Sequence, residues 1–324
     1  MTKQLIRIAL LLAAGSLASF ACAQGAYPTK PIRFVAPFPN GGTSDVICRL
    51  LAQRMTELLG QPVVVDNRPG ANANIGHTFV LNSPADGYTI LMSNNQVYTI
   101  NTYMFKQLPF DPYNDFLPVS IVAIGSQVLV VHPSVPANSV AELVALSRAK
   151  PGSINYGTGG QGSTAHISGE LFKTSTGANI THIPYKGIGQ AVIDLVGGSL
   201  HFMFSDMVPA IPHIKSGKLR PLGVTSDRRS RALADVPTMA EAGAAGYKAE
   251  TWWAVVVRKG TPNEIVNRLN DVLGQVMKMP DVVDRYTGLG IATAHTTPQR
   301  VIEMARAERP VIEKILKAAG LEPE

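Results

Sequence analysis

Cysteine, charge and long apolar runs are all scarce in this 324-residue sequence. Its two cysteines, Cys22 and Cys48, are too few for a disulfide framework, and Cys48 is expected to be a small buried residue on a helix. Only 16% of the residues are charged and they are scattered, so nucleic acid is not an expected partner. No stretch after the N-terminus approaches the roughly twenty apolar residues of a membrane span. The 45% of hydrophobic residues predicts a large packed interior.

Sequence signatures of catalysis and of metal binding are also missing. There is no G-x-S-x-G elbow, Walker loop, H-E-x-x-H or paired-cysteine motif, and the seven histidines show no ligand spacing. Ser163, His166 and Asp206 could be drawn as a hydrolase triad, but His166 lies only one helical turn after Ser163. We therefore expect no enzyme and no metal. An exported hydrolase that uses Ser163 and His166 is the alternative.

Residues 1–23 have the pattern of a secretory signal peptide. Basic residues precede a short apolar core, and Ala21 and Ala23 stand at the −3 and −1 positions of a small-residue cleavage site. Cleavage after Ala23 would place the mature chain in the periplasm. A lipoprotein anchored at Cys22 is the less favoured alternative, because Ser19 stands where such sites usually have Leu.

Apolar, β-branched runs alternate with stretches of helical period along the rest of the chain. This alternation predicts an α/β fold with mostly parallel strands. The expected strands are 32–36, 63–66, 89–93, 127–132, 153–156, 180–185, 200–205, 219–225 and 251–257. The expected helices are 45–59, 140–149, 165–175, 190–196, 262–277 and 298–319. Gly60 is placed to end the first of these helices as a C-terminal cap.

The chain is expected to cross between two lobes at two places. One is the stretch 119–126, and the other is the apolar strand 252–257, which is followed by a Gly-Thr-Pro break. If both are hinge strands, residues 24–123 and 252–324 form lobe I and residues 124–251 form lobe II. The protein is expected to act as a monomer.

A glycine-rich loop joins a strand to a helix once in each expected lobe. Lobe I has Pro37–Asp45, which contains Gly41-Gly42, and lobe II has Gly157–Thr164. Both loops present backbone N–H groups at a helix N-terminus, where the helix dipole adds positive potential. Such loops receive anions without a charged side chain. The competing interpretation is two tight turns with Ser or Thr caps, but matching loops in both lobes favour binding.

The second loop also matches the dinucleotide fingerprint G-x-G-x-x-G over residues 157–162. A nucleotide-binding fold of this kind usually carries an acidic residue at the end of the next strand to hold a ribose hydroxyl. Here the next strand ends in Tyr185-Lys186-Gly187, with no acidic residue, and the match begins in the middle of the chain. Lys186 could meet the 2′-phosphate of a phosphorylated dinucleotide, which stays the less favoured alternative. No cofactor is therefore expected.

Many short motifs along the mature chain resemble those of one known family. They are Tyr27–Ile32, Pro37-Phe38 with Gly41-Gly42, Gly60–Val65, Asn67–Ala71, Asn74–Gly76, Asp86–Thr89, Leu129–Pro133, Pro184–Gly187, Gly217–Arg220, Asp235–Thr238 and Glu241–Gly243. These motifs are similar to those of the Bug-type substrate-binding proteins, the extracytoplasmic receptors of tripartite tricarboxylate transporters. The resemblance implies a two-lobed periplasmic binding protein of the Venus-flytrap, type II-like architecture, with the ligand cleft between the lobes. It also implies a small carboxylate as ligand and membrane permease components as partners.

By this resemblance, the ligand contacts the two loops and a few residues of the cleft wall. The predicted ligand-binding residues are Phe38, Asn40, Gly41, Gly42, Thr43, Asp45, Ser93, Thr158, Gly159, Gly162, Ser163, Thr164, His166 and Asp206. Asn40 and Thr158-Gly159 depart from the residues usual in the family, so the ligand's shape stays open. A dicarboxylate, a tricarboxylate, an acidic amino acid and an aromatic acid are all compatible. A sensory binding module without a transporter would use the same site.

Overall fold

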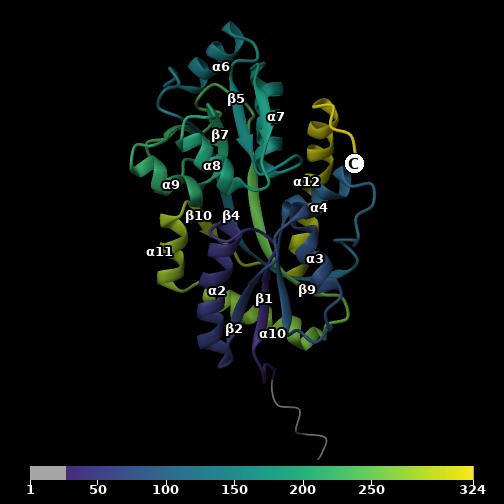
Figure 1. Cartoon of the computed structure of the whole chain (residues 1–324). Helices are drawn as coiled ribbons and strands as arrows, with labels where there is room; N and C mark the ends of the chain where they lie inside the picture. Colours follow the sequence, from purple (N-terminus) through teal and green to yellow (C-terminus); the bar gives the residue numbers. More distant parts are fainter. Residues whose placement is uncertain (1–26, 324) are drawn as a thin grey trace, which may run out of the picture.

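The computed structural model describes residues 27–323. The predicted signal peptide, its cleavage site and Cys22 lie outside these residues. The described chain forms two lobes, one above the other in Figure 1, and the segment after the second lobe returns to the first. Both lobes are α/β.

The sheet of the first lobe is built on a parallel core of three strands. Its strands are β1 (Ile32–Ala36), β2 (Val63–Asn67), β3 (Thr89–Asn94), β9 (Glu250–Arg258), β10 (Ile291–Thr293) and the first half of β4 (Phe116–Val131). β1 lies between β2 and β3 and is parallel to both. β9 pairs antiparallel with β3 and with β4, and β10 pairs antiparallel with β4.

The sheet of the second lobe has the same plan. Its strands are β5 (Asn155–Thr158), β6 (Thr181–Pro184), β7 (Phe202–Asp206), β8 (Arg220–Val224) and the second half of β4. β5 pairs parallel with β6 and β7, whereas β4 pairs antiparallel with β7 and β8. The continuous strand order β2-β1-β3-β9-β4-β7-β5-β6 therefore runs through both lobes by way of β4.

Helices cover both faces of each sheet. The first lobe carries α2 (Thr43–Leu59), η1 (Ala71–Ala73), α3 (Asn74–Leu81), α4 (Asn95–Thr99), α5 (Asn101–Met104), α10 (Asn263–Val276), α11 (Pro280–Gly288) and α12 (Pro298–Ala318). The second lobe carries α6 (Val140–Ala149), α7 (Thr164–Thr176), α8 (Ile188–Val196), α9 (Met207–Lys215) and η2 (Arg231–Leu233). In α2 the buried residues Ile47, Leu51 and Met55 recur every four positions and face the core. Gly60 ends this helix at a φ of 67°, as predicted.

Each lobe therefore has an apolar core on either side of its sheet. In the first lobe, α2, α10 and α11 pack on one face, and α3, α4 and α12 pack on the other. In the second lobe, one core includes α6 and α7, and the other includes α8 and α9. Sandwiching the sheets in this way holds the ends of the strands, and the loops that follow them, in fixed positions.

The sequence predicted most of these elements but not the single continuous strand that joins the two lobes. The stretch 119–126 lies inside β4, a single strand of 16 residues, instead of preceding a separate strand. The expectation of mostly parallel sheets holds only for the βαβ parts, because the two crossing strands β4 and β9 are antiparallel. β10 and the helices α3, α4, α5, α9 and α11 were not predicted. The limits of the two lobes stay a prediction.

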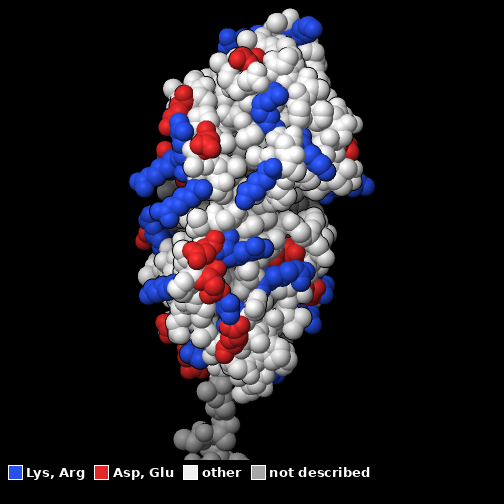
Figure 2. Space-filling view, turned by 90° about the vertical axis from the view of Figure 1, so that its left-hand side faces the viewer, with Lys and Arg blue, Asp and Glu red and all other residues white. Residues whose placement is uncertain are grey.

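The described surface shows mixed charges. In Figure 2, Lys and Arg side chains lie close to Asp and Glu side chains on the lower lobe, whereas Lys and Arg predominate on the part of the upper lobe next to the junction. Within residues 27–323, no helix is both long and apolar enough to cross a membrane.

Candidate functional site

Each glycine-rich loop makes a hydrogen bond across the junction between the lobes. Thr43 begins α2 in the first lobe, and its Oγ1 donates to Asp206 Oδ2, at the end of β7 in the second lobe, over 3.0 Å. Beside this contact, Asn72 Nδ2 of the first lobe donates to the carbonyl oxygen of Gln161 in the second loop, also over 3.0 Å. Both loops therefore lie at the junction between the lobes.

The first loop is held from within by the helix that it opens. Gly41 has a φ of +78°, a conformation that favours glycine, and its N–H donates to Asp45 Oδ2 over 2.9 Å. The N–H of Gly42 donates to the carbonyl of Pro39 over 3.3 Å. Among the described residues, none accepts a hydrogen bond from the N–H groups of Thr43 and Ser44, the first two residues of α2.

Asp45 carries the charge in this loop and is itself fully engaged. Besides the Gly41 N–H, its carboxylate accepts from Arg49 Nε over 3.1 Å and from Asn67 Nδ2 over 2.9 Å. Burial alone would raise the pKa of Asp45, but the hydrogen bonds from Arg49, Gly41 and Asn67 outweigh it and lower the pKa below the usual value. Asp45 is therefore ionised and has little capacity left for a ligand.

The second loop repeats this arrangement with a different side chain. Gly162 has a φ of +68°, and its N–H donates to His166 Nδ1 over 3.1 Å. Ser163 caps α7, because its Oγ accepts from the His166 N–H over 3.3 Å. For the next two residues, Thr164 and Ala165, the described part of the chain provides no acceptor for either N–H.

The two loops are thus equivalent position by position. In each, a glycine one residue before the cap adopts positive φ, and its N–H is accepted by the side chain of the third helical residue. The cap residue itself is Gly42 in the first loop and Ser163 in the second. Within the described residues, the helix N–H groups without an acceptor are those of Thr43, Ser44 and Asp45 in the first lobe and those of Thr164 and Ala165 in the second. Each helix N-terminus therefore suits an anion.

The structure changes which atoms of the predicted residues are available. The N–H groups of Gly41, Gly42 and Gly162 are satisfied inside their loops, so they are not the donors that the glycine pattern suggested. His166 is 3% exposed and braces Gly162, and we expected it to donate to a ligand. The available donors are the main-chain N–H groups that follow the glycines, together with the hydroxyls of Ser163 and Thr164, which only accept hydrogen bonds from described residues.

The remaining predicted residues lie at or near the junction, with one buried deeper. Phe38 packs on the first lobe's core beside the loop, Asn40 is exposed, and Gly159 is partly buried. Thr158 is buried and its Oγ1 accepts the Gly160 N–H over 3.2 Å. Ser93 is 1% exposed, and its hydroxyl lies 2.9 Å from His77 Nε2, so it supports the wall of the first lobe from inside.

Asp206 is an acidic side chain placed opposite the N-terminus of α2. Burial raises its pKa, while the hydrogen bonds from Thr43 and Gln127 oppose this effect. Gln127 also donates to Thr164 Oγ1 over 3.3 Å, so it connects Asp206 with the second loop. The junction thus has two helix N-termini and one carboxyl group whose charged form is disfavoured.

The hydrolase triad is not assembled. The imidazole of His166 bonds to the Gly162 N–H, and Ser163 Oγ contacts only the backbone N–H of His166. The carboxyl group of Asp206 bonds to Thr43 in the other lobe. A serine nucleophile must hydrogen-bond through its hydroxyl to the imidazole that acts as its base, and the side chains of Ser163 and His166 make no such bond.

Sequence reasoning missed the side chains that hold the loops. Asn67, Asn72, Gln127 and His182 come from distant segments, and no local pattern marks them. The acceptors were visible in principle, because Asp45 and His166 each stand four residues after the glycine that they brace.

Two lobes that share crossing strands, each presenting an unpaired helix N-terminus at their junction, define a two-lobed solute-binding protein. The sequence model of the family described as "Tripartite tricarboxylate transporter family receptor" matches residues 47–321. Protein BugT of Bordetella pertussis is 38% identical over 301 residues, which cover 93% of this chain and 92% of BugT. The chain belongs to this family of Bug-type receptors.

Solved structures agree with the family. Rpa4515 of R. palustris, solved with adipate, is 37% identical with a TM-score of 0.89 and covers 92% of this chain and 100% of its own. MatC (Rpa3494) from Rhodopseudomonas palustris, solved with bound malate, is 27% identical with a TM-score of 0.83 and covers 90% of this chain and 100% of its own.

Proposed function

We propose that this protein is exported, is cleaved after Ala23 and acts in the periplasm as a monomeric receptor. It captures a small carboxylate, in the first place a dicarboxylate, and passes it to membrane permease components of a tripartite transporter. It performs no chemistry on the ligand and needs no metal or cofactor.

The observation that carries this proposal is the pair of unpaired helix N-termini at the junction. The N–H groups of Thr43 and Ser44 come from one lobe and those of Thr164 and Ala165 from the other. The contact of Thr43 with Asp206 across the junction, and that of Gln127 with Thr164, support a shared space for these donors. Each terminus suits one carboxylate group, because its donors and its dipole both favour negative charge.

Two anion-receiving ends on opposite lobes favour a ligand with a carboxylate at each end. Binding such a ligand would pull the lobes together by bending at the crossing strands β4 and β9. The relatives solved with adipate and with malate carry ligands of this kind.

Matched pairs of acids test the proposal. We expect adipate and succinate to raise the midpoint of thermal unfolding, whereas hexanoate and butyrate, which lack the second carboxylate, have much smaller effects. A ligand at one hundred times its Kd stabilises the native state by about 2.7 kcal/mol, which is readily measured. If hexanoate stabilises the protein as well as adipate does, or if no dicarboxylate of four to six carbons stabilises it, the proposal fails.

A further inference from the structure

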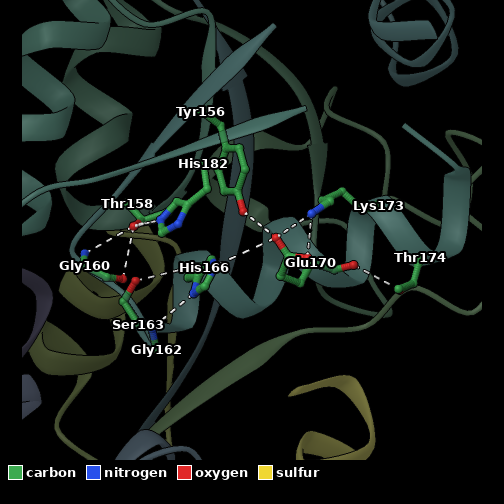
Figure 3. Close-up of polar contacts among 10 residues, drawn as sticks. All are labelled: Tyr156, Thr158, Gly160, Gly162, Ser163, His166, Glu170, Lys173, Thr174 and His182. Carbon is green, nitrogen blue, oxygen red and sulfur yellow. Dashed lines mark hydrogen bonds and ion pairs between the residues drawn. The ribbon is translucent and has the colours of Figure 1, made fainter. Parts of the chain in front are cut away.

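Two histidines, the buried His166 and the half-buried His182, are stacked beside the second loop, as Figure 3 shows. His166 lies in the first turn of α7 and His182 lies in β6. The ring centroids are 3.9 Å apart and the planes differ by 12°. His166 is 3% exposed, so a charge on its ring would be poorly solvated.

Each ring reaches a different glycine of the loop. His166 Nδ1 accepts the Gly162 N–H over 3.1 Å. His182 Nε2 lies 2.7 Å from Thr158 Oγ1, and that oxygen accepts the Gly160 N–H over 3.2 Å. Because Nδ1 of His166 accepts a hydrogen bond from an N–H group, it carries no proton, and the ring is the neutral Nε2–H tautomer.

The counter-charge nearest to a protonated His166 ring is the Glu170 carboxylate, which is already shared with other groups. Glu170 Oε1 is 3.8 Å from His166 Nε2, which is too far for a hydrogen bond. The Glu170 carboxylate is taken by Lys173 Nζ at 2.9 Å and by the Tyr156 hydroxyl at 3.1 Å. The helix α12, which packs against α7, meets it through apolar side chains, Leu316 against Ile167.

Burial accordingly lowers the pKa of both rings to about 4. The Lys173 ammonium lowers the pKa of His166 further. For His182, the neighbouring His166 acts in the same direction and Glu170 opposes it. The pair is therefore neutral at pH 7.

We propose that His166, stacked on His182, is a positioning residue of the second loop, and that proton uptake by this pair releases the Gly162 N–H and weakens ligand binding. Protonated Nδ1 has no lone pair and would face the Gly162 N–H donor to donor. Two charged rings at this distance would also repel one another. With Gly162 unbraced, the N–H groups of Thr164 and Ala165 would no longer be held toward the ligand.

The inference deepens the proposed function and rests on it where it concerns affinity. It goes beyond that function by assigning the acid sensitivity of the site to one lobe. In the first loop the equivalent brace is the ionised Asp45, whose pKa is lowered, so that loop stays braced while the histidine pair takes up its proton.

Two amide variants separate bracing from titration. In His166→Asn, the amide oxygen can accept the Gly162 N–H at the place of Nδ1 and cannot titrate. In His166→Gln, the amide reaches toward the place of Nε2 and leaves Gly162 without an acceptor. Affinity for adipate and for malate is measured by calorimetry from pH 7 to pH 4, and the asparagine variant controls for titration of the ligand and of Asp45.

At pH 7 we expect His166→Gln to bind about tenfold more weakly than His166→Asn, as the loss of one well-placed hydrogen bond predicts. Toward pH 4 the wild-type protein should lose more affinity than His166→Asn does. Equal affinity of the two variants at pH 7, or the same pH dependence in His166→Asn and in the wild type, would overturn the proposal.

A measurement without ligand keeps the inference separate from the proposed function. In the ligand-free protein, nitrogen NMR should show Nδ1 of His166 unprotonated at pH 7. The Gly162 amide should be protected from exchange at pH 7 and lose this protection toward pH 4, more than the Gly41 amide does. A protonated Nδ1 at pH 7 refutes the inference even if adipate binds. If neither acid binds but these signals appear, the receptor proposal fails and the positioning role stands.

Discussion

The two loops have the same backbone arrangement, but one is held by a charged side chain and the other by a neutral one. In both lobes a side chain on the third helical residue accepts the N–H of the glycine before the cap. The first lobe uses the carboxylate of Asp45, which accepts hydrogen bonds from Arg49 and Asn67. Arg49 also neutralises its charge. The second lobe uses the neutral imidazole of His166, which has no cation bonded to it. The backbone geometry is thus independent of the charge that supports it.

This difference concerns the charge beside each helix N-terminus, where we propose that an anion binds. Asp45 is compensated by Arg49, whose Nη2 lies 3.0 Å from Asp45 Oδ1, so the first helix terminus keeps its positive potential. The second loop has no such partner for its brace. A neutral brace therefore leaves the N-terminus of α7 free to attract a carboxylate.

Replacing the neutral side chain that accepts the Gly162 N–H by a charged one should have the largest effect on ligand affinity. His166→Asp puts a carboxylate at the second loop without an arginine to compensate it. An unpaired buried charge beside the ligand costs several kcal/mol, and we expect affinity for a dicarboxylate to fall by about a hundredfold or more at pH 7. Calorimetric titration measures the loss.

Asp45→Asn is the matched change in the first loop. It keeps an oxygen that can accept the Gly41 N–H and removes the charge, so it should weaken binding far less than His166→Asp does. Comparable losses in the two variants would show that the charge of the brace is unimportant.

The pH dependence of stability should be the next largest effect. The folded pKa of His166 is about 4 and its ordinary value is 6.5, so between these pH values the unfolded chain binds the proton and the native state does not. Stability is complete above about pH 6.5 and falls as pH drops toward 4, by at most about 3 kcal/mol from this group. Urea unfolding at pH 7 and pH 4.5 measures the change.

His166→Asn again supplies the comparison for this prediction. Because His77 and His182 also have pKa values of about 4, the variant should keep part of the pH dependence and lose the share of His166. An unchanged slope of stability against pH in this variant would count against a neutral His166 in the native state.

The caps of the two helices give a smaller contrast. Ser163 Oγ caps α7, whereas Gly42 provides no side-chain cap to α2. Ser163→Ala should lower the free energy of unfolding by about 1 kcal/mol, because the His166 N–H loses its acceptor. Chemical denaturation of the ligand-free protein tests this, and Ser163→Thr, which keeps the hydroxyl, should restore most of the stability.

Thr43 should affect ligand binding but hardly affect stability, which is the reverse of what we expect for Ser163. Its hydroxyl bonds to Asp206 across the junction, so Thr43→Ala should weaken ligand binding by about fivefold, in line with roughly 1 kcal/mol for a hydrogen bond. Thr43→Ser keeps the donor and should bind nearly as the wild type does. A large loss of stability in Thr43→Ala without loss of affinity would contradict the assigned role.

Much of this architecture can be predicted from the sequence, because it depends on local patterns. The apolar run of β1, the four-residue spacing of Ile47, Leu51 and Met55, and the stop at Gly60 are all visible in the chain. So are both glycine loops and their places before helices. The single strand β4 was not predicted, because pairing with β9 and β7, and not local sequence, keeps it extended across both lobes.

Within the site, sequence locates the loops but does not show which atoms remain available. Whether a given N–H is paired depends on the side chain of the third helical residue, which the pattern of glycines does not report. The stack of His166 on His182 joins α7 to β6, and the Asn67 contact joins β2 to Asp45; both arise only when the sheets form.

The most direct test is a crystal structure of the protein with a bound dicarboxylate such as adipate. The account predicts one carboxylate on the main-chain N–H groups of Thr43 and Ser44 and the other on those of Thr164 and Ala165, with Gly41 and Gly162 still bonded to their braces. A carboxylate held instead by lysine or arginine side chains away from the two helix termini, or bound to the N–H of Gly162, would contradict it.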